Sequence, residues 1–369
     1  MGDRVTRAGL DSLRVAVVSS RLWPGFNDIW DAVEPQVGSL VVVGARSPKD
    51  AGPDEPQRVA LRGVDLGRGL VWQHLVGLRR FLRSFSPDVI HVNRELWAVL
   101  AQEVVGSDAA VVVHGAENLW HHGGTAEQAV RRRLVDRAVR RIAGYASWNH
   151  AGADHVVRRR QELGLDPVPS LVLPAVVPPA PFRGVDWEPA LRPELEVLLV
   201  GRAVRAKGFE DVIEAAAGIP ALRITLCGAG DGLEALARLA ASRGVRLETP
   251  GQLKPLELAR VMARSDLLVQ PSRTTDDWAE QFGRTVAEAM TVGLPCLVSD
   301  SGELPHLVAH DPRAIFRERD VTDLREHLAE LRDPAALRGL ADRQRDPAAA
   351  WEPARAGAAV LDLWQRALP

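Results

Sequence analysis

Glu280 and Glu288 are two carboxylates eight positions apart in the stretch EQFGRTVAEAM, with Phe282, Gly283 and Arg284 between them. Carboxylate pairs that act together on one glycosidic bond lie ~5 to 9.5 Å apart. If the whole stretch were helical, eight residues would rise about 12 Å, which is too far for such a pair. We therefore expect the two glutamates to hold different parts of one long ligand.

A second group of candidate residues lies in GRAVRAKGFEDVI, directly after the apolar run LEVLLV. Gly201, Arg202, Arg205 and Lys207 fall in a glycine-flanked loop that opens a predicted helix. Glycine lets the backbone approach a ligand closely. A helix N-terminus favours anions, and arginine and lysine add charge-assisted hydrogen bonds. Each cation alone would be an ordinary solvated side chain, but their coincidence predicts a phosphate or diphosphate site.

Gly228 and Gly230 belong to a third glycine-rich turn, CGAGDGLEAL, which also joins a predicted strand to a helix. Its spacing is G-x-G-x-G and not the G-x-G-x-x-G of a dinucleotide-binding turn, so the motif is weak evidence. Tight packing and direct contact with a ligand both remain open for these glycines.

The elements that must position these residues alternate between short apolar runs and helical patterns. Such alternation predicts parallel sheets covered on both faces, with ligands beyond the carboxyl ends of the strands. DLLVQPS reads as a strand and SRTTDDWAEQ as a loop, so Glu280 faces the ligand and Glu288 lies inside the helix that starts near Phe282 and Gly283. The predicted strands are 13–20, 39–44, 88–92, 109–115 and 143–149 in the first half, and 195–201, 222–228, 245–251, 266–272 and 294–300 in the second.

The proline-dense segment 165–193 separates the two halves, because proline does not continue helices or central strands. We therefore predict an α/β chain with two doubly wound, Rossmann-like domains, at 1–178 and 190–351, and a final amphipathic helix at 352–369. A length of 369 residues agrees with two domains.

Composition excludes several classes of protein. The formal net charge is −2, so bulk charge gives no case for nucleic acid as a partner. The longest apolar runs are strand-length, well short of the ~18–20 residues of a membrane span, and the N-terminus lacks a signal-peptide pattern. Cys227 and Cys296 fall in apolar runs and are predicted to be small buried hydrophobes, not ligands or a disulfide. We expect a cytoplasmic protein.

Four motifs in one order and spacing carry a specific resemblance: GRAVRAKG, CGAGDG, DLLVQPS and EQFGRTVAEAMTVGLPCLVSDSGELPHLV. Over about 195–310 the chain resembles the family four retaining glycosyltransferases (glycosyl transferases group 1), which have the GT-B fold. The resemblance implies two Rossmann-like domains facing across a cleft, with a nucleotide sugar bound mainly by the second. It implies that Arg202 and Lys207 neutralise the diphosphate, that Glu280 contacts the donor sugar and that Glu288 contacts the ribose. It also implies that no metal is required, and that the final helix packs back on the first domain.

The first half matches this family less closely. His114 follows the predicted strand AAVVVHG, where the resemblance implies a histidine that positions the donor sugar. The usual glycine pair of the first loop is missing, since SSRLWPGFNDIW holds only Gly25. Gly25 and Asn27 are weak candidates for the acceptor side. Trp120 also follows a predicted strand and is a further candidate for stacking on a sugar, although core packing is the commoner role of such a residue.

The segment 131–141, RRRLVDRAVRR, places six arginines and one acid on a predicted helix. A solvated helix face is the ordinary interpretation. Docking on the inner face of an anionic membrane is the alternative, because basic amphipathic helices lie at such interfaces.

The resemblance thus implies a retaining glycosyltransferase of carbohydrate biosynthesis that moves a sugar from a nucleoside-diphosphate sugar to an acceptor hydroxyl. The acceptor would be a glycan, a glycolipid or a secondary metabolite. Two alternatives stay open: a GT-B-fold nucleotide-sugar epimerase or phosphorylase, and a non-catalytic partner subunit that binds nucleotide sugar.

Overall fold

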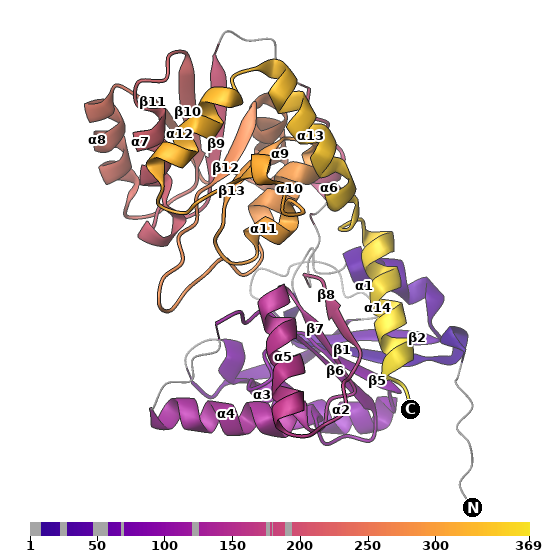
Figure 1. Ribbon diagram of the computed structural model, residues 1–369. Coiled ribbons are helices and arrows are strands. Elements are labelled where there is room, and N and C mark those ends of the chain that lie inside the picture. Colours follow the sequence, from indigo (N-terminus) through magenta and orange to yellow (C-terminus); the bar gives the residue numbers. More distant parts are fainter. Residues whose placement is uncertain are drawn as a thin grey trace, which may run out of the picture. The chain divides into compact units, whose positions relative to one another are not determined.

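The computed structural model describes residues 9–22, 28–46, 58–67, 70–119, 125–174, 178, 180–188 and 194–369. The chain divides into two compact units. The first unit comprises Met1–Val177 together with Pro353–Pro369, and the second comprises Pro178–Glu352. Each unit is built on its own largely parallel sheet (Figure 1).

Within the described residues, the sheet of the first unit has eight strands in the order β4-β3-β2-β1-β5-β6-β7-β8. Neighbouring strands are parallel except β3 and β4, which are antiparallel. The chain winds outward from β1 to β4 and then returns to pair β5 with the other side of β1, so the topological switch point lies between β1 and β5. The strands are β1 (Arg14–Leu22), β2 (Ser39–Arg46), β3 (Arg58–Asp65), β4 (Gln73–Val76), β5 (Val89–Val92), β6 (Ala110–Gly115), β7 (Gly144–Ser147) and β8 (Ser170–Val172).

Helices cover both faces of this sheet because its central strands are apolar on both sides. The helix α14 belongs to this unit and packs against α1 and strands β6, β7 and β8. A capping box between Thr125 and Gln128 starts α4, and the side chain of Asn149 caps α5. The helices are η1 (Leu10–Ser12), α1 (Asp28–Val33), η2 (Glu34–Gln36), η3 (Leu70–Trp72), α2 (Leu78–Phe85), α3 (Val99–Val104), α4 (Ala126–Val139), α5 (His150–Glu162) and α14 (Pro353–Ala367).

The sheet of the second unit has six strands among the described residues, in the order β11-β10-β9-β12-β13-β14, and all neighbours are parallel. The chain winds from β9 to β11 on one side and continues from β12 to β14 on the other. The switch point of this sheet therefore lies between β9 and β12. The strands are β9 (Leu195–Val200), β10 (Leu222–Cys227), β11 (Arg246–Gly251), β12 (Leu267–Gln270), β13 (Cys296–Ser299) and β14 (Ile315–Phe316).

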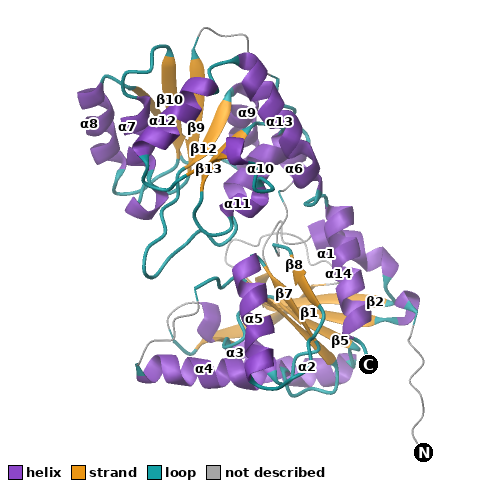
Figure 2. Cartoon of the chain, in the orientation of Figure 1, coloured by secondary structure: helices purple, strands orange, loops and turns teal. Residues whose placement is uncertain are grey.

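Two groups of helices flank the sheet of the second unit (Figure 2). One group contains α7, α8 and α12, which contact one another through α7, and the other contains α6, α9, α10 and α13, which contact one another through α10. The helices are α6 (Ala180–Arg183), η4 (Arg205–Lys207), α7 (Phe209–Ala216), α8 (Leu233–Arg243), α9 (Pro255–Arg264), α10 (Arg284–Val292), α11 (Leu304–Leu307), η5 (Pro312–Ala314), α12 (Val321–Glu330) and α13 (Pro334–Ala349).

Every strand predicted from an apolar run is present, and the predicted α/β fold class with two doubly wound sheets is confirmed. Four strands were not predicted: β3, β4, β8 and β14. The strand β8 lies inside the proline-dense segment predicted to be a linker, and it is an edge strand, where flanking prolines are tolerated. Among the described residues, no helix has both the length and the apolar character needed to cross a bilayer. Cys227 and Cys296 are free and buried, as predicted.

Candidate functional site

The candidate site lies in the second unit, in the two loops that follow β9 and β12 on either side of the switch point. The backbones of these loops are joined, since the N–H of Arg273 donates to the carbonyl of Ala206 at 2.8 Å. Gly208 has a φ of 64°, and a Cβ atom there would lie 2.1 Å from the carbonyl oxygen of Pro271. The close approach of the two loops therefore requires glycine at position 208.

Lys207 and Glu280 meet at this junction. Lys207 Nζ lies 2.6 Å from Glu280 Oε2, and the two side chains are 19% and 11% exposed. The hydroxyl of Ser272 donates to the same carboxylate oxygen at 2.7 Å. The ammonium also lies 5.1 Å from the centre of the Trp278 ring, which is within cation–π range. The structure thus brings together two predicted site residues and adds Ser272 and Trp278, which the sequence analysis did not single out.

Arg202 is exposed on the same loop as Lys207. Within the described part of the chain, no carboxylate pairs with its guanidinium. Arg273 differs, because its guanidinium is held by both carboxylate oxygens of Asp211 at 2.8 and 2.5 Å and by Glu210 at 2.5 Å. Arg202 therefore has N–H donors with which to bind an anionic ligand, whereas those of Arg273 already bind carboxylates within the protein.

Glu288 lies in the second turn of α10 and is buried, with 6% of its surface exposed. Burial raises the pKa of its carboxyl group to about 7, although Arg284, whose Nε is 3.3 Å away, acts in the opposite direction. Arg284 itself is largely exposed. An ordinary helix-surface glutamate would be solvated, so this burial agrees better with a carboxylate kept for a ligand.

Phe282 and Gly283 lead into α10. The Phe282 ring is buried and meets Trp351 edge-on at 6.1 Å, so the side chain anchors the loop in the core. Gly283 is the N-cap of α10 with a φ of 84°, a conformation that strongly favours glycine. Their contact with a donor ligand stays a prediction, and it would be made by the backbone N–H groups at the helix N-terminus.

The glycine turn after β10 packs against the loop after β9. A Cβ atom on Gly228 would lie 1.8 Å from the carbonyl oxygen of Gly201, and one on Gly230 would lie 2.9 Å from the backbone of Ala203. The N–H of Gly201 donates to the carbonyl of Cys227, and that of Ala203 to Ala229. Of the two interpretations left open by the sequence, this geometry favours tight packing for Gly228 and Gly230, which holds the loop of Arg202 and Lys207 in place.

His114 lies in the first unit at the end of β6 and is 2% exposed. Its Nδ1 is 3.0 Å from Nε2 of His91, and its Nε2 is 2.6 Å from the carbonyl of Leu173. Trp364 Nε1 donates to His91 Nδ1 at 3.0 Å, which forces both imidazoles into neutral, Nε2-protonated forms. Burial lowers the pKa of His114 to about 4. Both ring nitrogens are used inside the unit, so the sugar-positioning role stays a prediction that needs a rearrangement of this chain of hydrogen bonds.

Ser19 and Asn93 are polar residues at the switch point of the first sheet that sequence reasoning missed. They directly follow the paired residues Val18 and Val92 of β1 and β5. In the described part of the chain, the buried hydroxyl of Ser19 and both amide atoms of Asn93 have no hydrogen-bond partner. Asn93 directly follows the apolar run DVIHV, and a polar residue at that place in the sequence could have predicted its position at the end of a strand. The acceptor-side candidates Gly25, Asn27 and Trp120 lie outside the described residues.

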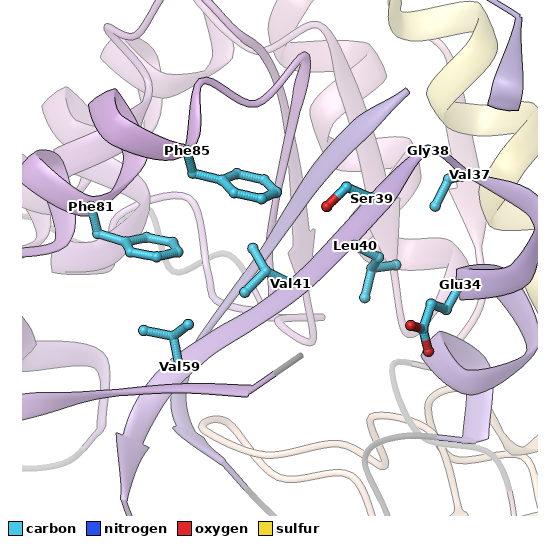
Figure 3. Close-up of a pocket in the computed structure, with 9 residues that line it drawn as sticks. All are labelled: Glu34, Val37, Gly38, Ser39, Leu40, Val41, Val59, Phe81 and Phe85. Carbon is cyan, nitrogen blue, oxygen red and sulfur yellow. The ribbon is translucent and has the colours of Figure 1, made fainter. Parts of the chain in front are cut away.

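A cavity of about 430 Å³ also opens in the first unit (Figure 3). It lies at the amino ends of β2 and β3, opposite the strand ends where parallel sheets bind ligands. The rings of Phe81 and Phe85 are stacked at its edge, with centres 5.9 Å apart. Its lining is Glu34, Val37, Gly38, Ser39, Leu40, Val41, Val59, Phe81 and Phe85, and we assign it no role in the chemistry of the site.

Comparison with known sequences finds a family similarity within the second unit. Residues 188–341 match the profile of the family Glycosyl transferases group 1. The chain is 32% identical over 152 residues to D-inositol 3-phosphate glycosyltransferase of Mycolicibacterium smegmatis, an alignment that spans 38% of this chain and only 34% of that relative. It is 26% identical over 336 residues to the GDP-mannose-dependent alpha-mannosyltransferase of the same organism, spanning 80% of this chain and 82% of the relative.

Comparison with solved structures identifies the fold. Sucrose-phosphate synthase from Thermosynechococcus elongatus superimposes with a TM-score of 0.66 at 18% identity, covering 95% of this chain and 97% of that one. The fold is therefore GT-B, as predicted. The solved structure identifies the fold alone, and the family match is confined to residues 188–341.

Proposed function

We propose that this chain is a glycosyltransferase that moves a sugar from a nucleoside-diphosphate sugar to a hydroxyl group of an acceptor, with retention at the anomeric carbon. The observation that carries the proposal is the pairing of Lys207 with Glu280 at the switch point of the second sheet, beside the exposed Arg202. Cations suit a diphosphate, and a carboxylate suits the hydroxyl groups of a sugar. Their adjacency matches a ligand in which sugar and diphosphate are joined.

In the proposed reaction, the bond between the anomeric carbon and the diphosphate oxygen breaks while the acceptor oxygen attacks from the same face. The acceptor proton passes to the departing diphosphate oxygen, so no enzyme nucleophile is needed. Negative charge grows on the diphosphate as the bond stretches. Arg202, Lys207 and the N-terminus of α10 at Gly283 stabilise this charge. Glu280 holds the donor sugar, and Glu288 accepts hydrogen bonds from the ribose.

We further propose that the reaction needs no metal ion, because Arg202 and Lys207 supply the positive charge that a divalent cation would otherwise provide. Lys207 can contribute while paired, since an ammonium has three N–H donors and Glu280 uses one of them. EDTA should therefore leave the rate unchanged, and added Mg²⁺ should not be required.

The acceptor side belongs in the first unit, where Ser19 and Asn93 offer unpaired polar groups at the strand ends. Hydroxyl and amide groups without net charge suit a polyhydroxylated acceptor. The relative that aligns over most of the chain is named for GDP-mannose, so GDP-mannose is the first donor to test. Inositol phosphates are the first acceptors, after the name of the more identical relative.

Contact with a membrane is a separate proposal for the segment 131–141. Part of its charge is committed, since Arg131 pairs with Glu117 at 2.7 Å and Asp136 pairs with Arg159. Arg132, Arg133, Arg140 and Arg141 remain exposed on α4 and just beyond it, beside Val130, which is also exposed. This surface suits anionic lipid headgroups. Co-sedimentation with vesicles that contain anionic lipid, lost at high salt, would support it, and equal binding to neutral vesicles would contradict it.

The test of the main proposal measures donor binding and turnover together. Thermal unfolding with UDP, GDP, ADP and TDP and their sugar conjugates should show a selective stabilisation by one nucleotide. Release of the nucleoside diphosphate should then require a hydroxyl acceptor and give a product with the donor's anomeric configuration. Turnover of donor without any acceptor would favour an epimerase, and turnover that depends on inorganic phosphate would favour a phosphorylase. Binding without turnover would favour a non-catalytic subunit.

A further inference from the structure

We propose that Ser272 and Gln270 are positioning residues that fix the carboxylate of Glu280 in the orientation needed to bind the donor sugar. The inference rests on the proposed function, which assigns Glu280 to that sugar. Neither residue touches the ligand in this account; both act through Glu280.

The three side chains form a line of hydrogen bonds at the carboxyl end of β12. Gln270 is the last residue of the strand, and its Nε2 lies 2.9 Å from the hydroxyl of Ser272. That hydroxyl lies 2.7 Å from Oε2 of Glu280, the oxygen that also receives Lys207 at 2.6 Å. Residues two apart on an extended chain point to the same side, which places Gln270 and Ser272 in line.

We call this line of hydrogen bonds, from Gln270 through Ser272 to Glu280, the relay. The donors and acceptors of its side chains fix its direction. An ionised carboxylate only accepts hydrogen bonds, and a hydroxyl has one proton to give. Ser272 must therefore donate to Glu280, which leaves its oxygen to accept from Gln270. The amide of Gln270 can donate this hydrogen bond only if its NH₂ group, and not its oxygen, faces Ser272. The relay thus runs from Gln270 through Ser272 to Glu280 and requires an amide, not a carboxylate, at position 270.

Because the relay is buried, its hydrogen bonds hold the Glu280 carboxylate in one orientation. Gln270 is 1% exposed and Ser272 is fully buried, so water does not compete for these bonds. The Oε1 atom of Gln270 has no hydrogen-bond partner in the described part of the chain. An unpaired buried acceptor lowers stability, and an apolar residue would avoid that cost at the end of a buried strand. The amide is therefore better explained by what its NH₂ group does for Ser272.

The consequence for binding is preorganisation. With Oε2 held from two directions by Ser272 and Lys207, the plane of the carboxylate is set before a ligand arrives. A sugar hydroxyl then meets an acceptor whose orientation costs little further entropy. Loss of the relay should weaken recognition of the sugar and leave recognition of the diphosphate almost intact, because Arg202 and Lys207 are unchanged.

The experiment compares two affinities by calorimetry, that of GDP or UDP and that of the matching GDP-mannose or UDP-glucose. Ser272→Ala removes the hydroxyl, and Gln270→Glu keeps the shape but replaces the donor by an acceptor. Ser265→Ala is the matched control, because Ser265 is equally buried at the other end of β12 and donates to Val261 at 2.9 Å. We expect both relay variants to lose roughly 10- to 100-fold in affinity for the sugar conjugate, with less than threefold change for the diphosphate. The Ser265 variant should lose neither.

A double-mutant cycle separates positioning from a general weakening of the fold. In a Glu280→Ala background, Ser272→Ala should have no further effect on the affinity for the sugar conjugate. An equal loss in that background, or equal losses for conjugate and diphosphate, would overturn the relay while the proposed function stands. If the unaltered protein binds no nucleotide, the proposed function fails, and the relay fails with it.

Discussion

Lys207 and Glu280 are 73 positions apart in the sequence, yet Nζ of the lysine lies 2.6 Å from Oε2 of the glutamate. They meet because they sit in the loops after β9 and β12, which are neighbours in the sheet although β10 and β11 separate them along the chain. Both side chains are mostly buried, so solvent screens this pair less than a surface ion pair. The pair is thus a preformed part of the site rather than a chance contact between solvated side chains.

Replacement of Lys207 by methionine tests this pair. The variant keeps an unbranched side chain that is one atom shorter and removes the charge, so it should slow nucleoside diphosphate release about 100- to 1000-fold, as loss of one preorganised donor typically does. The measurement is kcat/KM for donor turnover, with thermal unfolding to confirm the fold. Lys254→Met is the control, because Lys254 is exposed at the start of α9. A Lys207 variant within threefold of the unaltered protein would contradict the assigned role.

Gly208 and Gly244 form a matched pair for testing how the site loops are joined. Their φ angles are 64° and 67°, but a Cβ at Gly208 would meet the carbonyl oxygen of Pro271 at 2.1 Å, whereas nothing lies within 4 Å at Gly244. Gly244→Ala should cost only the left-handed strain, about 1–2 kcal/mol of unfolding free energy. Gly208→Ala should cost distinctly more and should also weaken diphosphate binding, because it pushes the loop of Lys207 away from β12. Denaturant unfolding measures the loss of stability in each variant, and calorimetry measures diphosphate binding. Equal losses of unfolding free energy in the two variants would show that the clash with Pro271 does not lower stability.

Much of the fold could be predicted because buried parallel strands are short runs of aliphatic residues, as in LEVLLV before the Lys207 loop. The order of strands and loops also placed Lys207 and Glu280 after strands, where ligands bind. The strand β3 was missed because arginine, glycine and aspartate interrupt its apolar residues, and its side chains are only partly buried. The strand β8 has three residues among prolines, too few to show a pattern.

Contacts that depend on the packing of distant elements could not be predicted. The sequence leaves Glu288 on either face of its helix, and the structure buries it. A histidine at a strand end looks available for a ligand, but the C-terminal helix brings Trp364 to His91 and thereby fixes His114. The relay through Ser272 likewise depends on the path of the loop after β12, which no periodicity describes.

The raised pKa of Glu288 predicts an unusual pH dependence. Its folded pKa of about 7 lies above its ordinary value of 4.5, so between these values the folded state binds more protons than the unfolded state. Stability contributed by the neutral group is present below pH 4.5 and is lost as the pH rises through 7. The full shift corresponds to about 3 kcal/mol. Glu288→Gln mimics the neutral form, so its stability relative to the unaltered protein should grow by about 2 kcal/mol between pH 5 and pH 8.

Urea unfolding of both proteins across this range measures that difference and cancels the titration of all other groups. The same variant should bind the nucleoside diphosphate more weakly at pH 8, because an amide replaces the carboxylate proposed to contact the ribose. Glu288 would then be a residue that lowers stability at neutral pH and raises affinity. A difference in unfolding free energy that stays the same from pH 5 to pH 8 would contradict the raised pKa of Glu288. An unchanged affinity for the nucleoside diphosphate would contradict the ribose contact.

His114 predicts the opposite dependence. Its folded pKa of about 4 lies below the ordinary value of 6.5, so the unfolded state binds more protons between those values. The free energy of unfolding should therefore fall as the pH drops from 6.5 toward 4, by about 3 kcal/mol for the complete shift. The cause is burial, which penalises the charged imidazolium. A second proton would also have to be placed on Nδ1, which already accepts from His91.

His114→Gln tests this linkage with a neutral side chain whose amide can still donate to Leu173. At pH 7.5 the variant should be less stable by about 1–3 kcal/mol, because the buried Nε2–H of His91 loses its acceptor. The deficit should shrink as the pH falls toward 5, since the unaltered protein loses stability from His114 and the variant does not. Denaturant unfolding at pH 5, 6, 7 and 8 measures the two slopes. A deficit that stays constant over this range would mean that His114 takes up its proton without disturbing the bond to His91, and would reopen the imidazole as a group free to meet a sugar.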